Sequence, residues 1–267
     1  MPVAKVNGIN IYNESHGKGD PLVLVMGMGG NMEAWRPHIP IYAKKFQVIA
    51  LDNRGTGRSD KPEGPYSIPQ FASDAVGLLD ALGIAKAHFY GISMGGLIVQ
   101  AIGLEYPTRV KSLILGCTTP GGPHAVPMSQ DAIATIGRAA QLPPEEGMKL
   151  TLTLSYSQEF IDRNYDMLLE RRKASNQYPT PPHAMKGHQE ALNSYSSYDR
   201  LPQMSVPVLV IGGRKDRIIP CENSEILARR IPEAHLVVME NAGHGYTLEA
   251  KDEAAKVVLD FLRRHRN

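Results

Sequence analysis

Short runs of consecutive aliphatic residues recur along the chain, and helical patterns lie between and after them. The runs are PLVLVM (21–26), FQVIAL (46–51), AHFY (87–90), VKSLILG (110–116), VPVLVIG (206–212) and HLVVME (235–240). Continuous apolar runs, rather than alternating ones, are typical of strands covered on both faces of a parallel sheet. Apolar positions recur at helical spacing in residues 68–83, 94–107, 221–232 and 249–265. This order predicts a doubly wound α/β fold with helices on both faces of a mostly parallel sheet.

The first two strands are predicted to form a hairpin. The segment VAKVNGINIYNE (3–14) places Asn7-Gly8 between two strand-like runs. Asn-Gly is the strongest short signal for a two-residue hairpin turn. With this hairpin, the sequence predicts a sheet of eight strands.

One long segment interrupts the alternation. Residues 120–201 contain no convincing strand, only short helix candidates separated by Pro, Gly and Ser. A chain of 267 residues is long enough for one α/β domain with an insertion. We expect a core of residues 1–119 and 202–267, with residues 120–201 inserted as a helical cap. Ligands of open α/β sheets bind beyond the carboxyl ends of the strands, so the cap would cover the site.

Composition excludes several classes of partner. The formal net charge is only +2, which gives no reason to expect a nucleic-acid partner. No apolar run is long enough to span a membrane, and the first residues lack a signal-peptide pattern. The two cysteines, Cys117 and Cys221, are expected to be free thiols in a reducing compartment. We therefore expect a cytoplasmic protein without nucleic-acid or membrane partners, and no pattern indicates its oligomeric state.

The segment GISMG (91–95) is the strongest candidate for chemistry. It lies between the predicted strand 87–90 and the helical pattern that starts at residue 94. Glycines two residues away on either side permit a tight turn that raises the Ser93 hydroxyl above the sheet. The first N–H groups of the helix would face the same point. A serine hydroxyl needs a general base to become a nucleophile, and the base needs an acid to orient it.

His244 is the best candidate for the base. It follows the last predicted strand directly, between Gly243 and Gly245, at the same edge of the sheet as Ser93. The other histidines lie in strands (His88, His235), in the cap as possible pocket lining (His124, His183, His188), or in loops and the terminus (His16, His38, His265).

Asp216 is the best candidate for the orienting acid, because it comes just after the strand at 206–212. Its rival is Asp52, which ends the strand at 46–51 but precedes the serine. The order Ser93, Asp216, His244 is that of one known fold. No carboxylate follows the strand at 110–116, so the alternative acid position of that fold is empty.

On these motifs the chain resembles the α/β-hydrolase fold superfamily over its whole length. MGMGGNMEAW follows the first central strand, and LDNRGTGRSD (51–60) resembles the D-x-R-G-x-G-x-S signature of capped members. SYDRLPQMSVPVLVIGGRKDRIIP is similar to the cap exit of the branch that contains small carboxylesterases and 3-oxoadipate enol-lactonase-like enzymes.

The resemblance implies roles for particular residues. Ser93 would be the nucleophile, His244 the general base and Asp216 its partner. The backbone N–H groups of Met28 and Met94 would form the oxyanion hole, and Gly27, Met28 and Met94 would line the substrate pocket. No metal or organic cofactor is implied. Many members have histidine where Met26 stands, and this departure removes a polar group beside the oxyanion residue.

The expected function is hydrolysis of a small, mainly apolar carboxylic ester or lactone through an acyl-serine. A small acyl molecule would be the partner. Carbon–carbon bond hydrolysis and perhydrolysis use the same triad and stay open, as does a slow or non-catalytic receptor on the same scaffold. A dinucleotide-binding oxidoreductase is disfavoured, because the third glycine of G-x-G-x-x-G falls on Met32.

Overall fold

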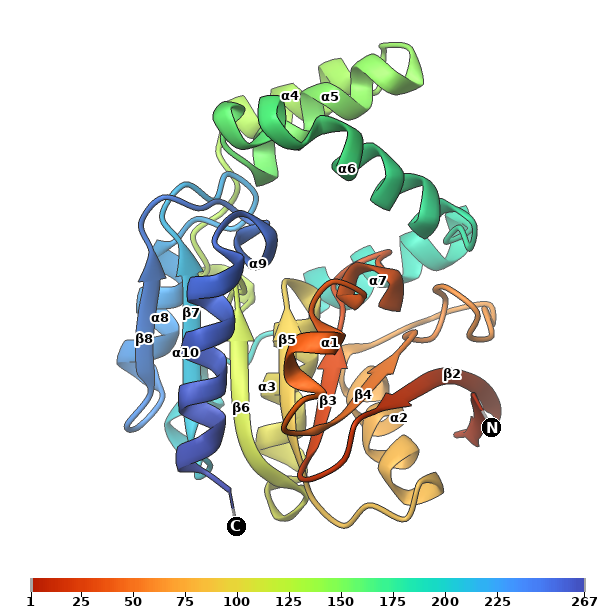
Figure 1. Ribbon diagram of the computed structural model, residues 1–267, viewed down its shortest axis with the longest axis vertical. Helices are drawn as coiled ribbons and strands as arrows, with labels where there is room; N and C mark the ends of the chain where they lie inside the picture. Colours follow the sequence, from red (N-terminus) through yellow and green to blue (C-terminus); the bar gives the residue numbers. More distant parts are fainter. Residues whose placement is uncertain (1, 267) are drawn as a thin grey trace.

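The computed structural model describes residues 2–266, and eight strands form a single sheet in it (Figure 1). The sheet order is β1-β2-β4-β3-β5-β6-β7-β8. The strands are β1 (Val3–Val6), β2 (Ile9–His16), β3 (Pro21–Val25), β4 (Gln47–Leu51), β5 (Ala87–Ile92), β6 (Val110–Gly116), β7 (Val208–Gly213) and β8 (His235–Met239). Only the pairs β1–β2 and β2–β4 are antiparallel. The predicted fold class and the number of strands are confirmed.

The β1–β2 hairpin turns at Asn7-Gly8, as predicted. Asn7 and Gly8 have φ values of 48° and 81°, and Val6 pairs with Ile9 across the turn. Positive φ at both central residues is the requirement of the tight hairpin turn that Asn-Gly favours. The turn therefore sets the register of the first edge of the sheet.

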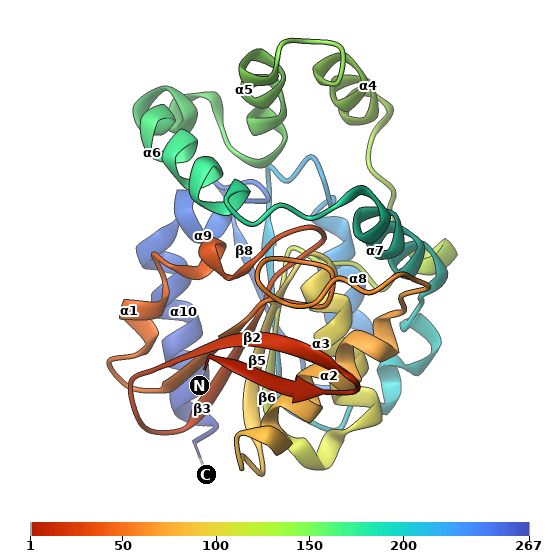
Figure 2. The same cartoon turned by 90° about the vertical axis from the view of Figure 1, so that its right-hand side faces the viewer.

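Helices cover both faces of the sheet (Figures 1 and 2). They are α1 (Ile39–Tyr42), α2 (Ile68–Ala81), α3 (Met94–Glu105), α8 (Glu222–Arg230), α9 (Tyr246–Glu249) and α10 (Lys251–Arg264), with the 3₁₀ helix η1 (Met32–Trp35). Along β3, Val23 and Val25 pack on the α2–α3 side, whereas Leu22 and Leu24 pack with η1, α1 and α10. Two apolar cores explain why the strands are apolar at every position. Among residues 2–266, no helix has the length and apolar character needed to cross a membrane.

Four α-helices lie between β6 and β7, beyond the carboxyl ends of the parallel strands (Figure 1). They are α4 (Gln130–Ala139), α5 (Pro144–Ser155), α6 (Gln158–Asn176) and α7 (Pro182–Ser194). Figure 2 shows α7 close to the core and α4 and α5 farther from it. The division into a core and a cap at residues 120–201 stays a prediction.

The loop LDNRGTGRSD serves mainly to hold the core together. Asp52 accepts hydrogen bonds from the backbone N–H groups of Met32 (2.7 Å) and Arg58 (2.8 Å). Arg54 forms a buried, two-pronged ion pair with Asp74 of α2, at 2.5 and 2.9 Å. Breaking such a pair from one side leaves an uncompensated buried charge. The loop therefore fixes the ends of β3 and β4 beside α2.

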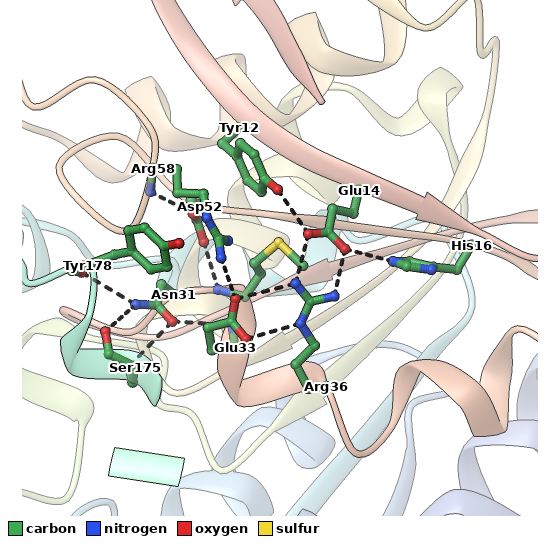
Figure 3. Close-up of polar contacts among 11 residues, drawn as sticks. Tyr12, Glu14, His16, Asn31, Glu33, Arg36, Asp52, Arg58, Ser175 and Tyr178 are labelled. Atoms are coloured by element: carbon green, nitrogen blue, oxygen red, sulfur yellow. Dashed lines mark hydrogen bonds and ion pairs between the residues drawn. The ribbon is translucent and has the colours of Figure 1, made fainter. Parts of the chain in front are cut away.

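A polar network ties the end of α6 to the core (Figure 3). The Asn31 side-chain amide donates to the Ser175 carbonyl oxygen at 3.0 Å. The Arg58 guanidinium lies between the rings of Tyr12 and Tyr178, 4.6 and 3.9 Å from their centroids. Cation–π contacts of this kind add to the hydrogen bonds in fixing the two parts relative to each other. The C-terminal half of α6 is thus held against the loop that follows β3.

The structure differs from the predicted elements at the end of β5 and in several short helices, among them η1 and α1. β5 continues through Gly91 to Ile92, because Gly91 pairs with Leu115 and leaves room for the first turn of α3. The helices η1 and α1 were not predicted. They are only four residues long each, too short for a helical period to be visible in the sequence.

Candidate active site

Ser93 occupies a strained turn between β5 and α3. Its φ and ψ are 59° and −127°, a conformation that residues with a side chain rarely adopt. Its backbone N–H donates to the Gly116 carbonyl oxygen at 3.0 Å, and its carbonyl oxygen accepts from Thr118 Oγ1 at 2.7 Å. A Cβ at Gly91 would collide with the backbone of Gly95. The glycines are therefore needed for the close approach that the sequence predicts, and β6 holds the serine in place.

Asp216 and His244 form a hydrogen-bonded pair. His244 Nδ1 lies 2.7 Å from Asp216 Oδ2, and the Asp216 side chain is fully buried. Asp216 Oδ1 accepts from the backbone N–H groups of Ile218 and Ile219, both at 2.8 Å. Because an ionised carboxylate only accepts, Nδ1 carries the proton and the Nε2 lone pair is free. The imidazole is held in the tautomer that a general base requires.

The turn at residues 27–30 lies directly against Ser93. A Cβ at Gly27 would be 2.8 Å from the Ser93 Cβ, and Gly30 N donates to the Gly27 carbonyl oxygen at 3.1 Å. Met28, in this turn, is 40% exposed, whereas Met94, the first residue of α3, is buried. The two residues predicted for the oxyanion hole thus flank the serine, and their role stays a prediction.

Ser93, Asp216 and His244 lie at the same edge of the sheet, but hydrogen bonds do not connect all three. Among residues 2–266, no hydrogen bond links the Ser93 hydroxyl to His244. Catalytic hydrogen bonds in unliganded enzymes are often long and shorten when substrate binds. The structure contains the Asp216–His244 pair, and the triad with Ser93 and its catalytic roles stay predictions.

The rival acid Asp52 is occupied elsewhere, since its two carboxylate oxygens accept the backbone bonds described above. Asn53 donates to the Met26 carbonyl oxygen at 2.9 Å, so this residue stabilises the loop that follows β4. His188, predicted as possible pocket lining, is instead fully buried in contacts with the core.

Cys117 fills the position after β6 where the resembled fold can carry its acid. Its Sγ lies with the ligand atoms of Asp216 and His244 in a group whose members are all within 4.8 Å of one another. Burial, the largest cause, raises the thiol pKa well above its ordinary value, and the Asp216 charge acts in the same direction. Cys117 and Cys221 are both free, as expected.

One arginine of the helices between β6 and β7 lines a cavity, and nothing in the sequence pattern singles it out. Arg171 of α6 lines a cavity of about 410 Å³, together with Tyr156 and Ile218. Its guanidinium donates to the Ala34 carbonyl oxygen at 2.9 Å, and no carboxylate in residues 2–266 pairs with it. Burial lowers the pKa of Arg171 from its ordinary value. The cavity adjoins the His244 loop, because Gly245 N donates to the Ser155 carbonyl oxygen at 2.9 Å.

Comparison with known proteins agrees with this geometry. A family model described as the alpha/beta hydrolase fold matches residues 20–250. The chain is 30% identical over 265 residues to the Azorhizobium caulinodans protein named "Putative carbamate hydrolase RutD", covering 98% of each chain. It is also 30% identical to the 2-hydroxy-6-oxononadienedioate/2-hydroxy-6-oxononatrienedioate hydrolase of Burkholderia vietnamiensis, over 95% of this chain and 90% of the relative.

A solved structure is similar over the same length. The crystal structure of the enol-lactonase from Burkholderia xenovorans superposes with a TM-score of 0.85 at 27% identity, covering 98% of this chain and 100% of the enol-lactonase. The chain belongs to the α/β-hydrolase fold family, and these similarities support a hydrolase.

Proposed function

We propose that this protein is a serine hydrolase that cleaves a small carboxylic ester or lactone through an acyl-serine intermediate. The observation that carries the proposal is the pair of His244 and Asp216 at 2.7 Å, at the sheet edge where Ser93 is held at φ 59°. A general base with its orienting acid, next to a serine held for attack, accounts for both features together.

The proposed reaction has two halves, acylation of the serine and hydrolysis of the acyl-serine, and the same groups act in both. Ser93 Oγ attacks the acyl carbon while His244 Nε2 takes the hydroxyl proton, and Asp216 stabilises the resulting imidazolium. The amide N–H groups of Met28 and Met94 bind the oxyanion, each such donor being worth about 3 kcal/mol of barrier. The imidazolium returns its proton to the leaving oxygen. Water, deprotonated by His244, then attacks the acyl carbon, and the imidazolium returns this proton to Ser93 Oγ as the acid leaves.

Covalent labelling tests this proposal directly. A fluorophosphonate should add to Ser93 and abolish hydrolysis of p-nitrophenyl esters, as measured by peptide mass spectrometry and absorbance. A parallel screen of esters of graded chain length, lactones and enol-lactones defines the acyl group. Turnover that persists in the fully labelled protein would contradict the serine mechanism.

The nature of the acyl group is the finer part of the proposal. Two exposed methionines that meet at the turn 27–30, Met28 and Met185, favour an apolar acyl chain. Arg171 favours a second candidate, in which the acyl chain ends in an anion. Its half-buried guanidinium pairs with no carboxylate of residues 2–266, so an anionic ligand would stabilise it. The relative that acts on a dioate supports this candidate, in which either an ester or a carbon–carbon bond is cleaved.

A matched pair of substrates distinguishes the apolar acyl chain from the anionic one. We expect Arg171→Met to raise KM for p-nitrophenyl succinate by about tenfold or more, equivalent to about 1.4 kcal/mol. KM for the uncharged ester p-nitrophenyl butyrate should change by less than about threefold. Arg163→Met is the control, since this arginine of α6 is exposed and does not line the cavity. Equal effects of Arg171→Met on both esters would exclude recognition of an anion.

A further inference from the structure

The turn that carries Met28 is held from outside the core by one short segment of the chain. Among residues 27–30, only Gly29 has the positive φ, +66°, that a turn of this kind needs at its third position. Its neighbour Met28 supplies the N–H group proposed above for the oxyanion. Any contact that fixes Gly29 therefore bears on the direction of that N–H group.

Three contacts from the segment 180–188 meet at Gly29. Its N–H donates to His188 Nδ1 at 3.3 Å, and its carbonyl oxygen accepts from Thr180 Oγ1 at 3.1 Å. A Cβ at Gly29 would collide with the methyl group of Met185. With the bond from Gly30 N to the Gly27 carbonyl oxygen, every peptide unit of the turn has a fixed partner.

The two hydrogen bonds of His188 determine its protonation state. Nε2 lies 2.9 Å from the Arg54 carbonyl oxygen, which can only accept, so Nε2 carries a proton. The Gly29 N–H can only donate, so Nδ1 must be bare. Both bonds exist together only in the neutral Nε2–H tautomer. The fully buried ring packs against Tyr66 and Phe71, with centroids 5.7 and 5.0 Å away.

We infer that His188 is a positioning residue for catalysis: its bare Nδ1 holds the Met28–Gly29 peptide so that the preceding N–H group points at the oxyanion. The role rests on the proposed function, because it acts through the Met28 amide and not on substrate. Through this hydrogen bond, the helical segment between β6 and β7 would affect the reaction itself, in addition to covering the site.

The positioning role is tested by substitutions of His188 that each keep only one of its two hydrogen bonds. His188→Asn can place an acceptor near the position of Nδ1, whereas His188→Gln can reach the Arg54 carbonyl oxygen but offers nothing to Gly29. We expect His188→Gln and His188→Leu to lower kcat for p-nitrophenyl butyrate by about tenfold to a hundredfold, below the full loss of one oxyanion donor. KM should change by less than about threefold, and His188→Asn should retain kcat within about threefold.

The pH profile supplies a readout that a merely structural role would not move. An imidazolium cannot accept from Gly29, so kcat falls as pH drops through the pKa of His188. Burial, the larger cause, lowers this pKa, and the bond to the Arg54 carbonyl opposes it. The charged and titratable groups around the ring are Tyr66 and Arg54, whose guanidinium is paired with Asp74. In the wild type, the fall of kcat toward acid pH should therefore be steeper, because His188 becomes protonated there. His188→Asn should lack this additional fall.

The outcomes separate this inference from the proposed function. Nitrogen-15 NMR of the His188 ring should show the Nε2–H tautomer whether or not the protein is a serine hydrolase. Wild-type turnover that depends on Ser93, with unchanged kcat in His188→Gln, would overturn the positioning role alone. Turnover independent of Ser93 would overturn the proposed function first. Equal kcat losses in His188→Gln and His188→Asn would also exclude the bond to Gly29 as the cause.

Discussion

Replacing Ser93 by alanine is expected to lower kcat by about a millionfold, the scale found when the nucleophile of a serine hydrolase is removed. Without the hydroxyl, neither the acyl-serine nor its tetrahedral precursor can form. The fold should be unaffected, because among residues 2–266 the Ser93 side chain makes no hydrogen bond, and its backbone bonds to Gly116 and Thr118 remain. Ester hydrolysis and thermal unfolding of the purified variant measure the two effects.

Two further variants show whether the loss of activity in Ser93→Ala comes from the missing hydroxyl. Ser205→Ala removes an exposed hydroxyl far along the chain and should leave kcat unchanged. Ser93→Gly should be as inactive as Ser93→Ala but more stable by about 1 kcal/mol, because glycine tolerates φ 59° without strain. Hydrolysis by Ser93→Ala within about tenfold of the wild type would remove the basis of the proposed mechanism.

Asp216→Asn is expected to lower kcat by about ten thousandfold at neutral pH. The asparagine oxygen can keep the bonds to Ile218 N and Ile219 N, which directs its NH₂ group toward His244 Nδ1. A donor there favours the tautomer with the proton on Nε2, and that nitrogen can then no longer accept the serine proton. The loss therefore comes from the wrong tautomer rather than from a displaced side chain.

The rival acid provides the control for this variant. Asp52→Asn should lower the melting temperature, since Asp52 caps two backbone N–H groups, while kcat of the folded protein falls by less than about tenfold. A reversed outcome, with Asp52→Asn inactive and Asp216→Asn active, would assign the acid to β4. Steady-state kinetics of both variants at several pH values decides between them.

Much of this architecture could be predicted because it depends on local patterns. The Asn7-Gly8 turn and the aliphatic runs act over a few residues, and strand ends in a parallel sheet meet at one edge. That is why Asp216 and His244 could be paired although 28 residues separate them. The glycines around Ser93 indicated its turn, although the sequence did not show that the strand continues through Gly91.

The features that were missed depend on packing between distant segments. Nothing in the sequence separates Arg171 from its neighbours, since its burial results from the way α6 lies against η1. His188 and Gly29 are 159 residues apart, and only the placement of α7 brings them together. Periodicity describes which face of a helix is apolar, but it does not say which loop that helix meets.

The contacts of residues 180–188 with Gly29 limit how this scaffold can be recombined. Exchanging the helices between β6 and β7 for those of a relative is an obvious route to new substrate range. In this protein, such a chimera would also discard the hydroxyl of Thr180 and the imidazole of His188 that hold the Gly29 peptide. Chimeras that retain this nine-residue stretch should preserve turnover while the remaining helices are varied, so the useful crossover point lies before residue 180.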